Sequence, residues 1–227
     1  MQDRARRRFI PRTRGRVSPG SRALRRACSR PYNPHPTEAI LEAFLVSLGI
    51  VALAEIGDKT QLLALVLAAR YRRPVPVILG ILVATLANHA LAAWLGAEVA
   101  GVLGRDALRW ILGLSFLAMA AWTLIPDKLE KEKTQGARLG AFAATLVAFF
   151  LVEMGDKTQI ATAALAARYA SIAAVVAGTT LGMMLADVPA VYFGERILRR
   201  VPVKTVRRAA ATIFSVLGAL ALLDAKF

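Results

Sequence analysis

Two short stretches of this 227-residue chain combine carboxylates with a lysine and with hydroxyl and amide side chains. Glu55-Ile-Gly-Asp-Lys-Thr-Gln61 and Glu153-Met-Gly-Asp-Lys-Thr-Gln159 differ at one position only. In each, Glu and Asp lie three residues apart, a spacing that places both carboxylates on one helical face. Hard oxygen ligands of this kind favour Ca²⁺, Mn²⁺ or Mg²⁺ over Cu⁺ or a thiolate zinc site. The candidate cation ligands are Glu55, Asp58, Thr60, Gln61, Glu153, Asp156, Thr158 and Gln159.

The two stretches together carry more negative than positive charge. Four carboxylates give −4, and Lys59 and Lys157 give +2, so −2 remains if the stretches meet. One divalent cation or two protons would balance that remainder. A purely structural alternative is that Glu, Asp and Lys form ion pairs that fix the packing of two halves of the protein. Ion pairing alone leaves the surplus charge, which favours a mobile counter-ion.

Both stretches lie in the middle of long apolar segments. Glu55 is near the centre of Ala39–Ala69, and Glu153 is at the centre of Leu139–Ala167. A charge at the centre of a bilayer costs about 2.5–3.5 kcal/mol, so these groups must face each other, a cavity or an ion. A straight helix of 31 residues would be about 46 Å long, well beyond the roughly 30 Å hydrocarbon core. Length and composition therefore predict a helix break near the Gly-Asp step of each stretch, which would free backbone carbonyls for a cation.

Composition indicates a membrane protein with a basic tail. Hydrophobic residues make up 56% of the chain and mean hydropathy is +0.50, yet the formal net charge is +15. Residues 1–37 hold eleven arginines against one acidic residue. This tail has no apolar periodicity, which predicts disorder and leaves a wrongly assigned start codon open. Nucleic-acid binding is not expected, because the arginine-rich tail lacks a folded partner element and interleaved aromatic residues. The apolar segments predict six membrane spans: Ala39–Ala69, Val75–Ala97, Ala107–Ile125, Leu139–Ala167, Ile172–Gly194 and about Val206–Leu223.

The chain also matches itself at an offset of 98 residues. Eleven of seventeen positions are identical between 55–71 and 153–169. This duplication predicts a first repeat at 38–125, a linker at 126–138 and a second repeat at 139–227. Three spans per repeat is an odd number, so the second repeat enters the membrane from the opposite side. The predicted fold is all-α, with six transmembrane helices in two inverted-topology three-helix repeats.

The distribution of positive charge predicts the orientation. Thirteen Lys and Arg residues fall in the loops after spans one, three and five or just beyond them, against four on the other side when the tail is left out. The positive-inside rule places those loops, including the 126–138 linker, in the cytoplasm. The arginine-rich tail conflicts with this orientation.

Two further polar positions lie in the second and fifth spans. His89 and Asp187 are related by the same offset of 98, and Asn88 precedes the histidine. They are candidates for proton acceptors or outer ligands, although a lone histidine in a membrane span is at least as often a packing residue. Gly178 and Gly182 form a Gly-x-x-x-Gly pair, which predicts close helix packing rather than a site.

Several classes of protein are excluded. Cys28 is the only cysteine and only two histidines are present, so a disulfide scaffold and a structural zinc site lack their ligands. The chain has no Walker loop, dinucleotide-binding Gly-x-Gly-x-x-Gly or Gly-x-Ser-x-Gly elbow. A metal-dependent membrane enzyme is also disfavoured, because the sequence has no additional base or nucleophile near the acids. We therefore expect a transporter, with no enzymatic activity and no resident cofactor.

The doubled motif resembles that of the Gdt-type cation/proton exchangers. Two copies of Glu-x-Gly-Asp-Lys/Arg-Thr/Ser, one per three-span half, match residues 55–60 and 153–158. The resemblance covers residues 38–227, and the short central loop is similar to that of compact bacterial manganese exporters. It implies exchange of Mn²⁺ or Ca²⁺ for protons across a bacterial inner membrane, with the motif acids as ligands.

The sequence thus predicts a secondary active exporter of a divalent cation. Lys59 and Lys157 would tune the site charge and hold the acids apart when the site is empty. The alternative is an exporter of a small cationic organic solute such as an amino acid, which would also need an apolar or aromatic pocket. The expected partners are the cation, protons and the lipid bilayer. The oligomeric state is not predicted.

Overall fold

The computed structural model describes residues 35–125, 140–194 and 202–223. The chain divides into two units, Met1–His35 and Pro36–Phe227, and all the described helices belong to the second. Most of the predicted tail and the whole predicted linker lie outside the described residues. The first described helix begins at Pro36, two residues before the predicted start of the first repeat at residue 38.

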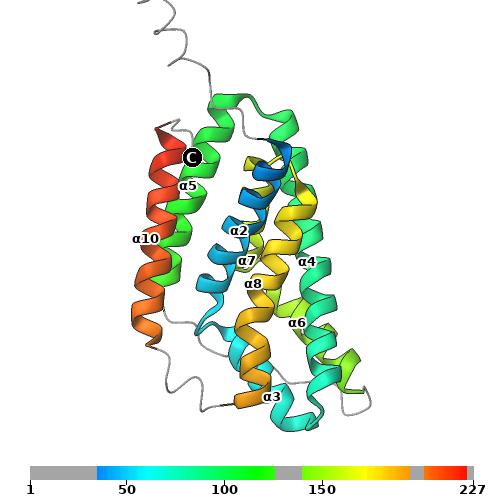
Figure 1. Cartoon of the computed structure of the whole chain (residues 1–227). Coiled ribbons are helices and arrows are strands. Elements are labelled where there is room, and N and C mark those ends of the chain that lie inside the picture. Colours follow the sequence, from blue (N-terminus) through cyan, green and yellow to red (C-terminus); the bar gives the residue numbers. More distant parts are fainter. Residues whose placement is uncertain (1–34, 126–139, 195–201, 224–227) are drawn as a thin grey trace, which may run out of the picture. The chain divides into compact units, whose positions relative to one another are not determined.

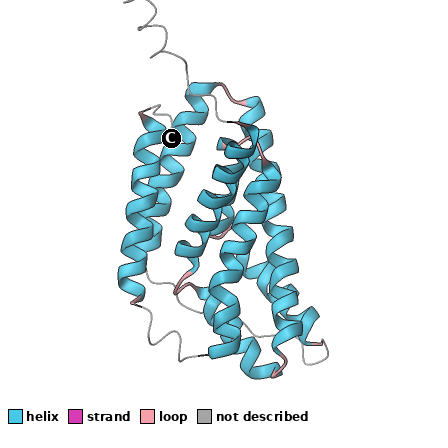
Figure 2. Cartoon of the chain, in the orientation of Figure 1, coloured by secondary structure: helices cyan, strands magenta, loops and turns pink. Residues whose placement is uncertain are grey.

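The described residues form helices and connecting turns (Figure 2). In chain order the helices are α2 (Pro36–Glu55), α3 (Lys59–Tyr71), α4 (Pro74–Val102), α5 (Arg105–Leu124), α6 (Ala141–Glu153), α7 (Lys157–Arg168), α8 (Ile172–Phe193) and α10 (Val203–Leu222).

The predicted helix breaks are confirmed in both motif stretches. The first apolar segment divides into α2 and α3, and the fourth divides into α6 and α7. Gly57 and Gly155 interrupt the helices with φ angles of 79° and 77°. These values lie in the left-handed region, which glycine adopts without the steric cost that a Cβ brings. Each glycine therefore ends one half-helix and lets the next begin two residues later.

Length and apolarity make this a multi-pass membrane protein. Within the described ranges, five helical segments are long and apolar enough to cross a bilayer: Pro36–Glu55, Pro74–Val102, Asp106–Leu124, Ile172–Phe193 and Val203–Leu222. Helix α6 is apolar but has only 13 residues. Many large apolar side chains face outward, as suits contact with lipid, and Leu151 and Phe193 are 59% and 64% exposed.

The helices of the two predicted repeats interleave rather than pack as separate bundles. The broken segment α2/α3 packs on α8, while the broken segment α6/α7 packs on α4. Helices α4 and α8 also contact each other, and α5 pairs with α10 at one side of the bundle (Figure 1). Each repeat thus lays its broken helix against the long second helix of the other.

Glycines allow the close helix approach that this interleaving needs. A Cβ on Gly182 would lie 2.6 Å from the Leu48 carbonyl of α2, and Gly178 lies equally tightly against the same helix. Gly80 of α4 meets α6 in the same way, with Thr145 Cβ at 2.8 Å from a built Cβ. The prediction that Gly178 and Gly182 serve helix packing is confirmed.

Corresponding helices run in opposite directions. In Figure 1, α4 runs along the chain from the bottom of the view to the top, and α8 runs from the top to the bottom. Helix α5 descends from the top of the view, and α10 rises from the bottom. Helices α3, α5 and α8 all end toward the lower part of the view.

Candidate functional site

The two motif stretches lie at the two helix breaks, where half-helices end and begin. Glu55 is the last residue of α2, and Asp58 is the N-cap residue of α3. Glu153 and Asp156 hold the same positions at the end of α6 and the start of α7. All four side chains are buried, at 0–2% exposure. The breaks therefore place each Asp at a helix N-terminus, where the helix dipole favours negative charge.

The two motifs contact each other through a reciprocal pair of salt bridges. Lys59 Nζ lies 3.0 Å from Asp156 Oδ1, and Lys157 Nζ lies 2.5 Å from Asp58 Oδ1. Each lysine thus reaches the aspartate of the other repeat. The predicted meeting of the two motifs occurs in the structure, and these pairs also fit the structural alternative in which ion pairs hold the halves together.

The two salt bridges differ in how completely they are buried. The side chain of Lys157 is 3% exposed and that of its partner Asp58 is 0% exposed. The side chain of Lys59 is 27% exposed, although its partner Asp156 is buried. The first pair is fully desolvated, whereas one end of the second remains open to its surroundings.

The glutamates carry the charge that the lysines leave unneutralised. Neither carboxylate oxygen of Glu55 has a hydrogen-bond partner among the described residues. Glu153 Oε2 accepts a bond from Thr158 Oγ1 at 3.0 Å, while its Oε1 has none there. If Lys59 and Lys157 balance the aspartates, the predicted surplus of −2 falls on Glu55 and Glu153. A buried carboxylate without a partner is costly unless a cation or a proton occupies it.

Asp187 brings a fifth carboxyl group to this region from α8. It is fully buried, neither of its oxygens has a hydrogen-bond partner in the described part of the chain, and it interacts electrostatically with Asp58. Glu55 and Glu153 lie within electrostatic range of each other and of Asp187. The position that the sequence marked on the fifth span therefore lies next to both motifs.

Asn88 and His89 lie at the matching place on α4 and are also fully buried. Asn88 Nδ2 donates to the Phe150 carbonyl of α6 at 3.1 Å, which ties α4 to the helix it packs against. Both ring nitrogens of His89 lack hydrogen-bond partners among the described residues. Asn88 thus makes a hydrogen bond that holds two helices together, while the ring of His89 makes no hydrogen bond to the described residues.

The two glutamines hold the breaks in shape. Gln61 Oε1 accepts from the Gly57 backbone N–H at 2.9 Å, and Gln159 Oε1 accepts from that of Gly155 at 2.7 Å. Gln61 Nε2 also donates to the Ala186 carbonyl at 2.9 Å, next to Asp187. In this structure the amide oxygens predicted as cation ligands are engaged by the backbone.

The two threonines of the motifs are buried in the first turns of α3 and α7. Thr158 Oγ1 donates to Glu153, whereas Thr60 Oγ1 has no partner among the described residues. Within those residues, no three His, Cys, Asp or Glu side chains are grouped as ligands for one metal ion. The oxygens that the sequence singled out are gathered in one region but are not arranged as a preformed coordination sphere.

One contact at the site was not predicted from the sequence. Arg207 of α10 donates from its guanidinium to the Gly57 carbonyl at 2.8 Å, and Val203 covers the same glycine. In the sequence, Arg207 is only one of the thirteen Lys and Arg residues in the cytoplasmic loops or just beyond them. A signal was available, since Arg109 precedes it by the repeat offset of 98 residues.

Comparison with known proteins agrees with the duplicated architecture. The family model described as "Divalent cation/proton antiporter GDT1" matches the chain twice, over residues 43–131 and 141–227. The chain is 54% identical over 183 residues to a "Putative manganese exporter" of Vibrio cholerae, covering 80% of this chain and 91% of that protein. It is 28% identical to "GDT1-like protein 5" of Arabidopsis thaliana, over 82% of this chain and 97% of that protein. No solved structure matches.

The two family matches correspond to the two motif-bearing halves, and each contains one broken helix with its acidic pair. The resemblance drawn from the doubled motif is thereby confirmed. The chain is a transporter rather than an enzyme, and it belongs to the GDT1 family of divalent cation/proton antiporters.

Proposed function

We propose that the protein exports Mn²⁺ from the bacterial cytoplasm in exchange for protons, with Ca²⁺ as the second candidate ion. Family membership supplies the class of reaction. Manganese is favoured by the name of the Vibrio cholerae relative, at 54% identity. The hard oxygen character of the buried side chains suits both ions.

The buried, unpartnered glutamates are the observation that carries the proposal. Glu55 and Glu153 come from opposite repeats, are 0% exposed and retain free carboxylate oxygens among the described residues. They are the expected primary ligands, and Asp187 would add a third carboxylate. Metal and protons compete for the same oxygens, which couples the two fluxes. Two glutamates that each exchange one proton would give two protons per divalent cation.

The aspartates and lysines would regulate access of the cation to these glutamates. In this structure Lys59 and Lys157 form salt bridges with the aspartates and act as internal counter-ions. An arriving cation would replace the ammonium groups, so that Asp58 and Asp156 join the coordination together with Thr60 or Thr158. The lysines would return when the metal leaves and neutralise the aspartates again, while protons on the glutamates would balance the remaining charge.

The proposed architecture is six spans in two inverted repeats, with α2/α3 and α6/α7 each counted as one broken span. Three features support it: the two family matches, the crosswise salt bridges and the opposite directions of corresponding helices in Figure 1. Inverted repeats with broken helices at the midplane suit alternating access, in which two pseudo-equivalent conformations open to opposite sides. The cytoplasmic side would be the end that carries Arg72 and Arg73.

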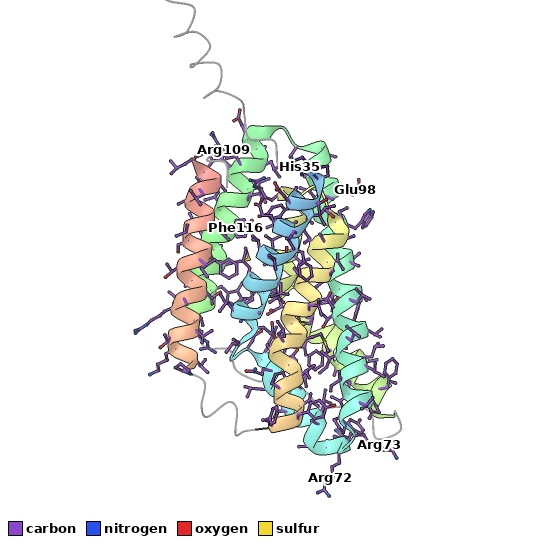
Figure 3. The ribbon with its side chains drawn as sticks, in the orientation of Figure 1. His35, Arg72, Arg73, Glu98, Arg109 and Phe116 are labelled. Atoms are coloured by element: carbon purple, nitrogen blue, oxygen red, sulfur yellow. The ribbon has the colours of Figure 1, made fainter. Side chains whose placement is uncertain are left out.

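The test is flux in proteoliposomes loaded with Mn²⁺ under an imposed pH gradient. We expect wild-type exchange to stop in Glu55→Gln and in Glu153→Gln, and to stop or slow strongly in Asp58→Asn. Glu98→Gln is the matched control, because Glu98 is an exposed carboxylate on α4 away from the motifs (Figure 3). Unchanged exchange in both glutamate variants would refute the assignment of ligands.

Ion selectivity and stoichiometry follow from the same preparation. Competition by Ca²⁺ and Mg²⁺ ranks the ions, and flux at zero membrane potential compared with an imposed potential shows whether exchange of two protons per ion is electroneutral. Transport of a cationic amino acid that Mn²⁺ does not inhibit would instead support the organic-solute alternative.

A further inference from the structure

The two helix breaks have the same backbone conformation but different surroundings. Gly57 and Gly155 have φ angles of 79° and 77°, and a glutamine holds each in the same way. A Cβ added at Gly57 would collide with the Val203 side chain, whereas one added at Gly155 would meet no atom of the described residues within 4 Å. Gly155 is exposed and Gly57 is partly covered. The first break is therefore closed by α10, and the second is open.

Arg207 makes the contact that closes the first break. Its guanidinium donates to the Gly57 carbonyl, a group that the interruption of the helix leaves for an outside donor. Its repeat counterpart is Arg109 on α5, and the counterpart of Gly57 is Gly155. Arg109 does not make the corresponding bond: its nearest carboxylate is Asp106, at 4.0 Å, and its Nε has no partner in the described part of the chain.

Helix packing shows the same asymmetry. Helix α10 packs on α2, and α5 packs on α7. The repeat-exchanged contacts would be α5 on α6 and α10 on α3, and among the described helices these are at most marginal. The α5/α10 pair therefore packs asymmetrically against the two broken helices. It contacts the first half of one (α2) and the second half of the other (α7).

We infer that Arg207 and Arg109 are alternating gate residues, and that each fixes the closed break in one of the two access states. This inference rests on the exchange mechanism proposed above. In the present structure Arg207 holds the first break shut while the second is open. In the opposite state α5 would move onto α6, Arg109 would bind the Gly155 carbonyl, and Arg207 would release Gly57.

The placement of the two arginines supports opposite gates. Arg109 lies at the end of the bundle opposite to Arg72 and Arg73 (Figure 3). Helix α10 begins at the end where those two arginines lie, and Arg207 is in its second turn. By the positive-inside rule Arg207 closes the cytoplasmic side, so the present conformation is closed to the cytoplasm while the second break is uncovered.

The experiment measures the reactivity of single cysteines at two matched positions, in protein that carries Cys28→Ser. Ile56→Cys and Met154→Cys lie 98 residues apart and each precedes the glycine of its break. Their rates of labelling by a hydrophilic maleimide are compared in lipid nanodiscs, where both faces are accessible. No transported ion is needed.

Arg207→Ala should raise the labelling of Ile56→Cys and lower that of Met154→Cys. Arg109→Ala should do the reverse. Loss of one hydrogen bond from a charged donor should change the ratio of the two rates about tenfold. Arg207→Lys, which keeps the charge but not the planar fork, should give a smaller change of the same sign. Arg208→Ala removes an exposed neighbouring charge and should leave the ratio unchanged.

Opposite shifts from the two arginine variants would support the gate, because general loosening of the fold would raise both rates together. Shifts in the same direction, or none, would refute it. If Arg207→Ala does not yield folded protein, Arg207→Lys carries the same prediction with the same refuting result. Failure of wild-type protein to exchange Mn²⁺ would instead refute the proposed function, and that measurement is independent of labelling.

Discussion

The crosswise salt bridges predict unequal effects of two otherwise equivalent substitutions. Asp58→Asn removes the partner that lies 2.5 Å from Lys157, whose side chain is 3% exposed. Breaking a buried ion pair from one side costs about 3–5 kcal/mol, because the remaining charge stays desolvated. Asp156→Asn removes the partner of Lys59, whose side chain is 27% exposed and therefore less completely desolvated than that of Lys157. That loss should be nearer about 1 kcal/mol, as for a partly exposed pair.

The difference is large enough to measure as thermal stability. For a chain of this size, 1 kcal/mol corresponds to about 2–4 °C in Tm. Asp58→Asn should therefore lower the Tm of detergent-solubilised protein by roughly 6–20 °C, and Asp156→Asn by about 2–4 °C, on those scales. Tryptophan fluorescence during heating reports both. Each variant also relieves repulsion with the glutamate of its own motif, and Asp58→Asn additionally relieves repulsion with Asp187, which makes the expected difference between the variants a little smaller.

A double substitution separates the ion pair from other effects. Asp58→Asn with Lys157→Met removes both charges, so no buried ammonium is left without its carboxylate. We expect this variant to be more stable than Asp58→Asn alone, since replacing a whole buried pair often costs little. Equal losses from Asp58→Asn and Asp156→Asn, or a double variant less stable than Asp58→Asn, would refute this account of the asymmetry.

Three further predictions follow from the same geometry. Gly57→Ala and Gly155→Ala bear the same backbone strain at positive φ, but only Gly57→Ala clashes with α10. Gly57→Ala should therefore lower Tm by several degrees more than Gly155→Ala, and equal losses would contradict the closed first break. Glu55→Gln should abolish exchange while leaving Tm unchanged or higher, because it removes a buried charge without a hydrogen-bond partner among the described residues; a large drop in Tm would indicate a structural role. Burial and, secondarily, Glu42 raise the pKa of Tyr169 to about 12, so ultraviolet titration should show a late-ionising phenol that Tyr169→Phe removes. The phenol of the unfolded chain ionises first, near its ordinary pKa of about 10, so the contribution of Tyr169 to stability should fall as pH rises from about 10 to about 12. If Tyr169→Phe does not change the pH dependence of stability in that range, the shift is contradicted.

Much of the fold was predictable because it depends on local signals. Apolar length located the helices, and a segment too long for one span with a glycine at its centre located the break at Gly57. The break at Gly155 followed from the repeat. The boundaries were less accurate: α4 extends to Val102, five residues beyond the predicted end at Ala97, because apolar length alone does not mark where a helix stops once it leaves the membrane core.

The candidate site was predictable in composition but not in pairing. The motifs contain more carboxylates than lysines, so a counter-ion was expected however the side chains pair. The repeat offset of 98 residues marked Asp187 as a further polar position. The sequence could not show that Lys59 would contact Asp156 rather than Asp58, its neighbour in the chain. That choice depends on how closely the two half-helices approach. Six spans in inverted repeats and the roles of individual ligands stay predictions.

By itself the sequence determined the identity of the chemical groups, their depth in apolar segments and the duplication that provides them twice, since all three depend on residue type and spacing along one chain. Only the tertiary structure decided which lysine neutralises which aspartate and why the glutamates keep the surplus charge. It alone showed that α10 closes one break and leaves the other open. Repeats that are nearly identical in their motifs can occupy different environments because the helices packed around them break the symmetry, and packing across 98 residues is not encoded in any local pattern.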